Sequence, residues 1–338
     1  MKICFLGGGS WATALAVVLA DNKHKTVVYM RNEKDVLLFN EVHENVHYLK
    51  GVSLDKSIEF TSDMEYALKD AKMVVLAVGA QNIREILNKA NKYIEKDAII
   101  LNVSKGIEVD SLKLVSQVVK EFSSNPYGTL SGPTHAEEVS IRIPTAIISS
   151  SESLEVAEKV QDIFMNDYFR VYTSMDILGV ELGGALKNII ALGTGISDGL
   201  KCGDNTKAAL MTRGVYEISK MGVKMGADPK TFSGLSGIGD LIVTCTSMHS
   251  RNRRAGILIG EGHSLEETLE KIGMLVEGIK TTKSAYDLSK KLGVEMPITE
   301  EMYNVLYNGT DIKDTVYNLM LREKKHEMEI VFDVKDEK

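Results

Sequence analysis

The stretch that decides the fold is KICFLGGGSWATALAVVLADNKHKTVVYM, residues 2–30. An apolar run leads through consecutive glycines into a segment of helical character, and a second apolar run follows. This order predicts a strand, a glycine turn, a helix and a strand within about 30 residues. In that turn Gly7 permits the bend, Gly9 lets the backbone approach a pyrophosphate, and Ala12 permits close packing of helix on strand. The free N–H groups at the helix start favour phosphate, so the stretch predicts dinucleotide binding.

The same residues share some features with a signal peptide or a short membrane span, because an apolar stretch follows Lys2. The glycines disfavour a hydrophobic helix, and a second strand at residues 26–30 is not what a secretion signal predicts. We therefore expect no membrane insertion and a cytoplasmic location. The cysteines, Cys4, Cys202 and Cys245, are odd in number and widely spaced, so they indicate neither a disulfide framework nor a metal site.

Apolar and helical segments alternate up to about residue 175, and the remainder is almost entirely helical. The continuous apolar runs at 73–78 and 98–103 are typical of buried parallel strands. The sequence predicts an α/β protein: a Rossmann-type, mostly parallel sheet in residues 1–175 and an all-helical domain in residues 176–338. Strands are predicted at 2–6, 26–30, 73–78, 98–103, 128–130, 145–149 and 169–173. Helices are predicted at 10–19, 81–93, 110–122 with Asp110 as its cap, 135–137, from 152, and at 177–197, 205–225, 251–260, 265–272, 277–292, 298–307 and 312–321.

Composition is that of a soluble globular protein, with 44% apolar and 26% charged residues over 338 positions. A net charge of -7 argues against a general nucleic-acid binder, which would carry a basic face. The short basic cluster at residues 251–254 could still hold one phosphate. These features favour a small-molecule partner.

A second stretch, VELGGALKNIIALGTGISDG at residues 180–199, predicts an apolar helix with Lys187 in its middle. No acid lies three or four residues away, so the helix itself offers no ion-pair partner. Gly183 and Gly184 would let other backbone or a ligand approach closely. Partial desolvation would lower the pKa of the amine toward the range of proton transfer. The alternative is a lysine whose stem covers apolar surface while its ammonium reaches water.

Three further positions carry chemistry that could serve a site, each with an ordinary alternative. Lys105 follows a predicted parallel strand, at the sheet edge that binds ligands, and is either a ligand contact or a turn lysine. Asp240 follows several glycines and either belongs to a site or caps a helix. The pair Arg251 and Asn252 either holds a phosphate or forms a surface turn.

The residues that follow the second predicted strand bear on whether the cofactor is NAD or NADP. Arg31 could meet the 2′-phosphate of NADP, whereas Glu33 could bind the ribose hydroxyls of NAD, or both are solvated turn residues. The sequence leans slightly toward NADP. Together, a dinucleotide turn, a lysine, an aspartate and an arginine are what a reductase of a phosphorylated carbonyl compound needs.

Five motifs recur together in one known family: GGGSWATALA (7–16), SKGIE (104–108), SGPT (131–134), VELGGALKN (180–188) and GIGDLIVTCTSMHSRNRRAG (237–256). In these motifs, and over essentially the whole chain, the sequence resembles the NAD(P)-dependent glycerol-3-phosphate dehydrogenase family, bacterial type. The resemblance implies reversible reduction of dihydroxyacetone phosphate to sn-glycerol 3-phosphate, a phospholipid precursor, with NADP or NAD and without a metal. A homodimer is a further expectation from the family.

The resemblance implies that Lys187 is the general acid/base and that Asp240 orients it or a substrate hydroxyl. Arg251 would bind the substrate phosphate, touch the cofactor and, as a nearby cation, depress the pKa of Lys187. The implied substrate-binding residues are Lys105, Gly132, Thr134, Lys187, Asp240, Ser250, Arg251 and Asn252. The implied cofactor contacts, which join Gly7, Gly9 and Ala12 of the turn, are Ser10, Trp11, Arg31, Lys105, Ala136, Arg251, Leu275 and Glu277.

The chain departs from the family pattern in places. Thr134 stands where a serine is usual, and His135 replaces a usual aromatic residue and either titrates or packs. Residue 31 varies in the family, so the cofactor preference does not carry over. Two rival functions are a hydroxy-acid dehydrogenase, which would bind a carboxylate, and a catalytically silent dinucleotide sensor.

Overall fold

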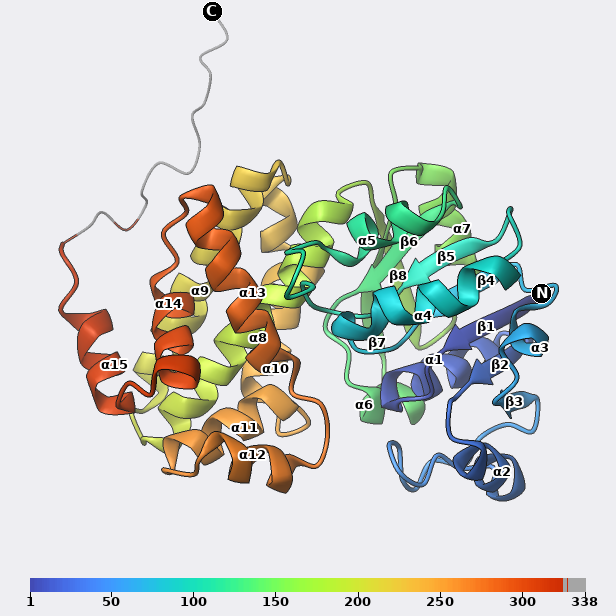
Figure 1. The fold of residues 1–338 in the computed structure, drawn as a ribbon, viewed down its shortest axis with the longest axis horizontal. Coiled ribbons are helices and arrows are strands. Elements are labelled where there is room, and N and C mark those ends of the chain that lie inside the picture. Colours follow the sequence, from blue (N-terminus) through green and yellow to red (C-terminus); the bar gives the residue numbers. More distant parts are fainter. Residues whose placement is uncertain (325–326, 328–338) are drawn as a thin grey trace, which may run out of the picture.

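The computed structural model describes residues 1–324 and residue 327, which form two lobes side by side (Figure 1). The first lobe is built on an eight-stranded sheet of order β3-β2-β1-β4-β5-β6-β7-β8. Neighbouring strands are parallel except β6 and β7, which are antiparallel. The strands are β1 (Lys2–Leu6), β2 (Lys25–Tyr29), β3 (Ile58–Thr61), β4 (Met73–Leu76), β5 (Ile99–Asn102), β6 (Tyr127–Ser131), β7 (Thr145–Ser150) and β8 (Phe169–Ser174).

Both faces of this sheet are covered, which explains its continuously apolar strands. Successive side chains of a strand point to opposite faces, so Ile3 and Phe5 of β1 join one core cluster while Cys4 and Leu6 join another. Helices α1, α6 and α7 contribute to the first cluster, and α3, α4 and α5 to the second. The helices of this lobe are α1 (Ser10–Asp21), α2 (Glu33–Val42), α3 (Met64–Leu68), α4 (Ile83–Ala90), α5 (Val115–Phe122), α6 (Ala136–Ser140) and α7 (Leu154–Phe164).

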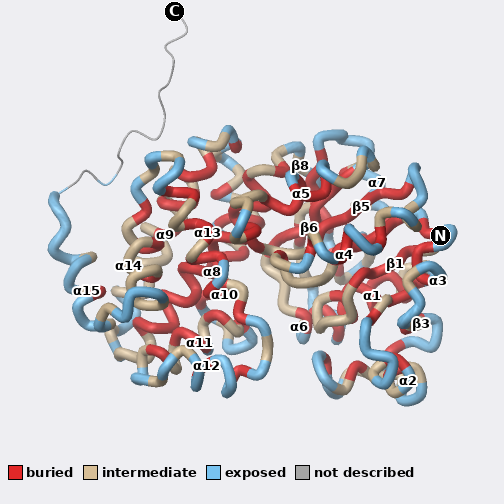
Figure 2. Tube along the Cα trace, viewed as in Figure 1, coloured by how far each residue is buried: buried red, intermediate tan, exposed pale blue. Residues whose placement is uncertain are grey.

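The second lobe is helical and is organised around α8, which is buried along most of its length (Figure 2). Among the described residues α8 is the one helix long and apolar enough to cross a membrane, but 94% of its apolar window is buried inside the protein. It therefore serves as the core of the lobe. The helices are α8 (Ile177–Gly199), α9 (Asp204–Met225), α10 (Asp240–Thr246), α11 (Arg251–Gly260), α12 (Leu265–Ile272), α13 (Glu277–Leu292), α14 (Pro297–Tyr303) and α15 (Ile312–Met320).

The predicted fold class, a mostly parallel Rossmann-type sheet followed by helices, is confirmed. Strand β3 and helices α2, α3 and α10 are additions that the sequence did not predict. The predicted cap at Asp110 is wrong, because α5 begins at Val115 with Leu114 in the N-cap position. Ile107 and Leu114 pair in an isolated bridge and pack in the core of the helical lobe, which draws the intervening segment away from a helix.

The change from strands to helices falls between the end of β8 at Ser174 and the start of α8 at Ile177. We therefore propose residues 1–175 and 176–338 as the two domains, of which residues 325–326 and 328–338 lie outside the described part. Residues 107–114 show that the two cores are not strictly separate in sequence.

Candidate active site

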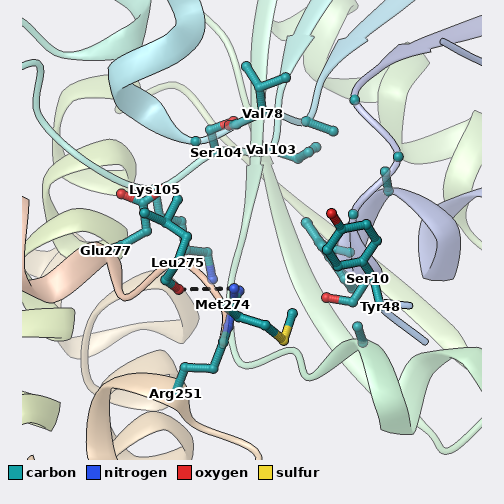
Figure 3. Close-up of a pocket in the computed structure, with 18 of the residues that line it drawn as sticks. Ser10, Tyr48, Val78, Val103, Ser104, Lys105, Arg251, Met274, Leu275 and Glu277 are labelled. Carbon is teal, nitrogen blue, oxygen red and sulfur yellow. Dashed lines mark hydrogen bonds between the residues drawn. The ribbon is translucent and has the colours of Figure 1, made fainter. Parts of the chain in front are cut away.

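A cleft of about 790 Å³ lies between the lobes. Ser10 and Tyr48 face it from the sheet lobe, while Arg251, Leu275 and Glu277 face it from the helical lobe (Figure 3). Most of the predicted site residues line this cleft: Gly7, Gly9, Ser10, Trp11, Ala12, Arg31, Lys105, Thr134, Ala136, Lys187, Ser250, Arg251, Asn252, Leu275 and Glu277. The two predicted residues that do not line it, Gly132 and Asp240, lie behind it and contact Lys105.

The glycine turn leaves the start of α1 open to the cleft. Gly7 has a φ of +113°, and a Cβ there would lie 2.6 Å from the carbonyl oxygen of Ala77, so the turn requires glycine. Gly9, at the N-cap of α1, provides no side-chain cap, and the first turn of the helix contains no acidic residue. The backbone N–H groups in the first turn of α1 therefore have no partner within the helix. Together with the helix dipole they fit the phosphates of a dinucleotide.

The end of β2 distinguishes the two candidate ribose contacts. Arg31 is exposed and lines the cleft. Glu33 is the first residue of α2 and is not among the lining residues, while Asn32 caps that helix by accepting from the Lys34 N–H at 3.1 Å. Of the pair, Arg31 is the one placed at the cleft.

Lys187 is buried at the cleft, with 5% of its surface exposed. Its ammonium donates to the carboxylate of Asp240, which is fully buried, and to the Thr244 hydroxyl at 2.6 Å. That hydroxyl donates in turn to the Asp240 carbonyl oxygen at 2.6 Å. The helix offers Lys187 no partner of its own, as predicted, but α10 brings one from 53 residues away. The alternative of an ammonium that reaches water is wrong.

Burial and charge together set the proton affinity of this amine. Burial lowers the pKa of Lys187 to about 7, Asp240 opposes that change, and the ammonium of Lys105 lowers the pKa further. A nearby cation that lowers this pKa is therefore present, as predicted, and it is Lys105. An amine with such a pKa is suited to give and take a proton near neutral pH.

Lys105 is tied to the helical lobe, so the alternative of a simple turn lysine is wrong. Its ammonium donates to Asp240 at 2.7 Å and to the carbonyl oxygen of Gly132 at 3.1 Å. Its stem passes close to α8, because a Cβ at Gly184 would lie 3.5 Å from the Lys105 Cγ and 2.8 Å from the Ser131 Oγ. The small residues before Lys187 therefore permit a close approach, as predicted.

The start of α11 forms the second open edge of the cleft. Ser250 caps this helix by accepting from the Arg253 N–H at 3.2 Å, so its hydroxyl is engaged in the helix start. The Nη1 of Arg251 donates to the Leu275 carbonyl oxygen at 3.0 Å, the dashed contact in Figure 3. Asn252 donates to Asn188 and accepts from the backbone of α13, each at 2.9 Å. Backbone N–H groups and a guanidinium thus meet where an anion would bind.

Glu277 closes the cleft at the start of α13. One carboxyl oxygen accepts from the Ala80 N–H at 3.3 Å, while Oε2 is buried without a hydrogen-bond partner among the described residues. Burial raises the pKa of Glu277 to about 7, and Arg251 and the Ala80 N–H oppose this. An unpartnered carboxyl oxygen at this place fits a polar group of a bound cofactor.

The two positions that depart from the family pattern are both at the cleft. The Thr134 hydroxyl donates to the Gly132 carbonyl oxygen at 3.1 Å. The His135 ring lies against the ring of His249, with 5.6 Å between centroids, and burial lowers its pKa. A lowered pKa keeps the imidazole neutral near pH 7, which favours packing over titration.

Some lining residues were not predicted. Asn188 directly follows Lys187, and Thr244 lies one helical turn after Asp240, so their positions within the recognised motifs could have indicated them. His249 and Arg254 lie in the same motif as Arg251. Residues such as Tyr48 and Met274 carry no local signal for a site.

A glycine turn on one side of a cleft and a buried amine on the other is the arrangement that hydride transfer coupled to proton transfer requires. The fold and the cleft define the class of NAD(P)-dependent dehydrogenases. Within it, the family model for the C-terminus of NAD-dependent glycerol-3-phosphate dehydrogenase matches residues 176–317, and the model for the N-terminus matches residues 2–157. The chain therefore belongs to the NAD-dependent glycerol-3-phosphate dehydrogenase family.

Individual relatives agree with this assignment. A protein of Bacillus velezensis named glycerol-3-phosphate dehydrogenase [NAD(P)+] is 55% identical over 332 residues, which cover 97% of this chain and 96% of that protein. The crystal structure of glycerol-3-phosphate dehydrogenase from Coxiella burnetii has a TM-score of 0.92 at 34% identity, covering 95% of this chain and 99% of that one. The Plasmodium falciparum glycerol-3-phosphate dehydrogenase has a TM-score of 0.87 at 26% identity, with 96% and 97% covered.

Proposed function

We propose that this chain catalyses the reversible, NAD(P)H-dependent reduction of dihydroxyacetone phosphate to sn-glycerol 3-phosphate, with Lys187 as its general acid/base. The observation that carries the residue assignment is the buried Lys187 ammonium, held by Asp240 and Thr244 at a cleft whose other side is an uncapped helix start. Family membership supports the reaction itself.

The cofactor site proposed here consists of the α1 start with Gly7 and Gly9, and of Arg31 at the exposed edge. Bound NAD(P)H supplies the hydride. Arg31 supports a preference for NADP, because a guanidinium matches a 2′-phosphate and Glu33, the first residue of α2, does not line the cleft. Further proposed cofactor contacts are Ser10, Trp11, Ala12, Lys105, Ala136, Arg251, Leu275 and Glu277.

Proton transfer by Lys187 depends on the Asp240 carboxylate, which is shared by two lysines. It accepts from both Lys187 and Lys105, so two ammonium groups are held by one negative charge. Their mutual repulsion favours loss of one proton, and burial makes Lys187 the one that loses it. In the reduction Lys187 gives this proton to the ketone oxygen, and in the oxidation the neutral amine takes it from the alcohol. Asp240 holds the amine in place in both directions.

For the substrate phosphate we propose the start of α11. Its backbone N–H groups, oriented by the Ser250 cap, and the guanidinium of Arg251 give an anion both charge and direction. Asn252 is held from two sides and would keep this edge fixed. Lys105, Gly132 and Thr134 would complete the substrate site from the sheet lobe.

A steady-state assay tests this function. The oxidation of NADPH and NADH is followed with dihydroxyacetone phosphate and, separately, with 2-keto acids. We expect turnover with dihydroxyacetone phosphate alone. Turnover with keto acids would favour the hydroxy-acid dehydrogenase, and cofactor binding without turnover of either substrate would favour the silent sensor. A cytoplasmic location and a homodimer remain predictions.

A further inference from the structure

A second buried carboxyl group lies on α8, less than two turns before Lys187. Glu181 is 6% exposed and does not line the cleft. It accepts from the Ser116 N–H at 3.2 Å, from the Ser116 hydroxyl at 2.7 Å and from the Tyr127 hydroxyl. It also accepts from the Asn102 side-chain amide at 3.2 Å. These donors come from α5, β6 and β5, so Glu181 fastens the helix of the catalytic lysine to the sheet lobe.

Asn102 extends this attachment to the loop of Lys105. Its side-chain oxygen accepts from the Ser104 N–H at 2.8 Å, and its amide donates to the Ser104 carbonyl oxygen at 3.1 Å. The Ser104 hydroxyl lies within hydrogen-bond distance of the carbonyl oxygens of Leu76, at 3.1 Å, and Val78, at 2.6 Å, which ties the same turn to the end of β4 and the loop after it. Asn102 therefore fixes the backbone from which the Lys105 side chain starts.

The contacts close into a ring. From Ser104 the chain continues to Lys105, whose ammonium shares the Asp240 carboxylate with Lys187, and Lys187 lies on the same helix as Glu181. Both ends of the network are thus on α8. The ring runs through Glu181, Asn102, Ser104, Lys105, Asp240 and Lys187.

We propose that Glu181 is a positioning residue for the reaction: through Asn102 it holds the Lys105 turn against α8 and so sets how closely the two lysines approach each other at Asp240. The inference rests on the proposed role of Lys187 and extends it. Glu181 does not line the cleft, so an effect on proton transfer would be indirect, and the ring gives it a path to Lys105.

The ring affects the pKa of the Lys187 amine. The charged and titratable groups that act on Lys187 are Asp240 from α10, Lys105 from the sheet lobe, His135 before α6, and Cys245 of α10. Of these, Lys105 lowers the pKa of Lys187 and is placed by the ring. If the turn loosens, Lys105 moves away and water enters, and both changes raise the pKa of Lys187 toward its ordinary value.

The test compares Glu181→Gln with Glu217→Gln, a matched control. Glu217 is also buried, at 3% exposure, and accepts from the Ile298 N–H at 2.7 Å and the Thr299 N–H at 3.3 Å at the start of α14, away from the cleft. We measure kcat for dihydroxyacetone phosphate reduction from pH 6 to 10, a range of about four units that spans the titration of Lys187. We also measure the KM for NADPH and Tm.

For Glu181→Gln we expect kcat to fall about tenfold, the scale for residues that orient a catalytic group, with an unchanged KM for NADPH. The decline of kcat at high pH should move upward by roughly half a pH unit or more. Glu217→Gln should lower Tm without moving the pH profile. Asn102→Ala should move the profile in the same direction, and the double variant should add little, because both changes break one ring.

A wild-type pH profile in either Glu181→Gln or Asn102→Ala, or an equal displacement in Glu217→Gln, overturns the proposal. If Glu181→Gln does not fold, Asn102→Ala decides alone. A wild-type enzyme that does not reduce dihydroxyacetone phosphate would instead remove the proposed function, so the two failures are distinguishable.

Discussion

The two sides of the cleft offer different chemistry. Where the cofactor phosphates would bind, the sheet lobe presents backbone: a glycine turn and the uncapped start of α1. Where the proton would be transferred, the cleft is built from buried side-chain charges, Lys187 with its partners Asp240 and Lys105. Backbone groups need only the fold to hold them, whereas buried charges need specific partners from elsewhere in the chain. Changes at the glycine turn should therefore alter cofactor affinity, and changes among the charged side chains should alter turnover and substrate binding.

The largest effect is expected for Lys187→Met, which keeps most of the unbranched side chain and removes the amine. We predict that kcat falls by a factor on the order of 10² to 10⁴, the usual range for a positioned acid–base group. Cofactor affinity, measured by NADPH fluorescence, should stay within about twofold of wild type, because the phosphates are held by backbone. Lys207→Met is the control, since Lys207 pairs with Asp198 at 2.6 Å outside the cleft. A near-wild-type kcat in Lys187→Met would contradict the assignment of Lys187 as the general acid/base.

Arg251→Ala should come next. A charge-assisted contact to a phosphate is worth about 1.5 to 3 kcal/mol, so the KM for dihydroxyacetone phosphate should rise roughly 10- to 150-fold. Arg253→Ala is the control on the same helix, because Arg253 pairs with Asp198 at 2.8 Å and does not line the cleft. If Arg251→Ala changes only the Kd of the cofactor, then Arg251 belongs to the nucleotide site through its contact with Leu275.

Gly9→Ala probes the sheet side. A Cβ at this position would meet nothing within 4 Å, so Tm should stay unchanged. The methyl group would instead project toward the phosphates, and the Kd for NADPH should weaken about tenfold, or about 1.4 kcal/mol. A kcat that falls while Kd stays constant would contradict the division of labour between the lobes.

The smallest effect is expected at Arg31. Because this side chain is exposed, its contact with a 2′-phosphate should contribute only about 1 kcal/mol. Arg31→Ala should lower kcat/KM for NADPH about fivefold and leave kcat/KM for NADH unchanged. Steady-state assays with both cofactors give the ratio, and an equal loss with both would show that Arg31 does not select the cofactor.

The sequence predicts best what is decided locally. The glycine turn depends on adjacent residues, and helices α11, α12 and α13 begin and end where they were predicted. Strand β3 is a short edge strand with alternating burial, which gives little signal. Helix α10 has the sequence DLIVTCT, whose β-branched residues favour a strand; packing against α8 makes it helical.

The functional site, like the fold, is predicted from the residues only where the signal is local. Small residues around Lys187 predict a desolvated lysine, but its partner Asp240 lies 53 residues away, and Lys105 lies 135 residues from that aspartate. Helical periodicity cannot join such pairs. The resemblance to a known family supplied the link between Lys187 and Asp240, whereas the pairing of Lys105 with Asp240 is seen only in the folded chain. The sequence offered Arg251 as an example of a cation near the amine, and only the folded chain shows that Lys105 lies beside it.

The pH dependence of kcat/KM, which reports groups of the free enzyme, tests the account most directly. Lys187 must be protonated to act as an acid, and its pKa in the free protein is lowered to about 7, so kcat/KM for reduction should be highest below this pH and fall above it. Oxidation of glycerol 3-phosphate needs the neutral amine and should rise with pH over the same range. We predict that the two pH profiles change in opposite directions and that both have their midpoint near pH 7. This midpoint lies about 3 pH units below the pKa of an ordinary lysine. Profiles that stay flat from about pH 6 to pH 9 in both directions would contradict a buried lysine as the proton donor.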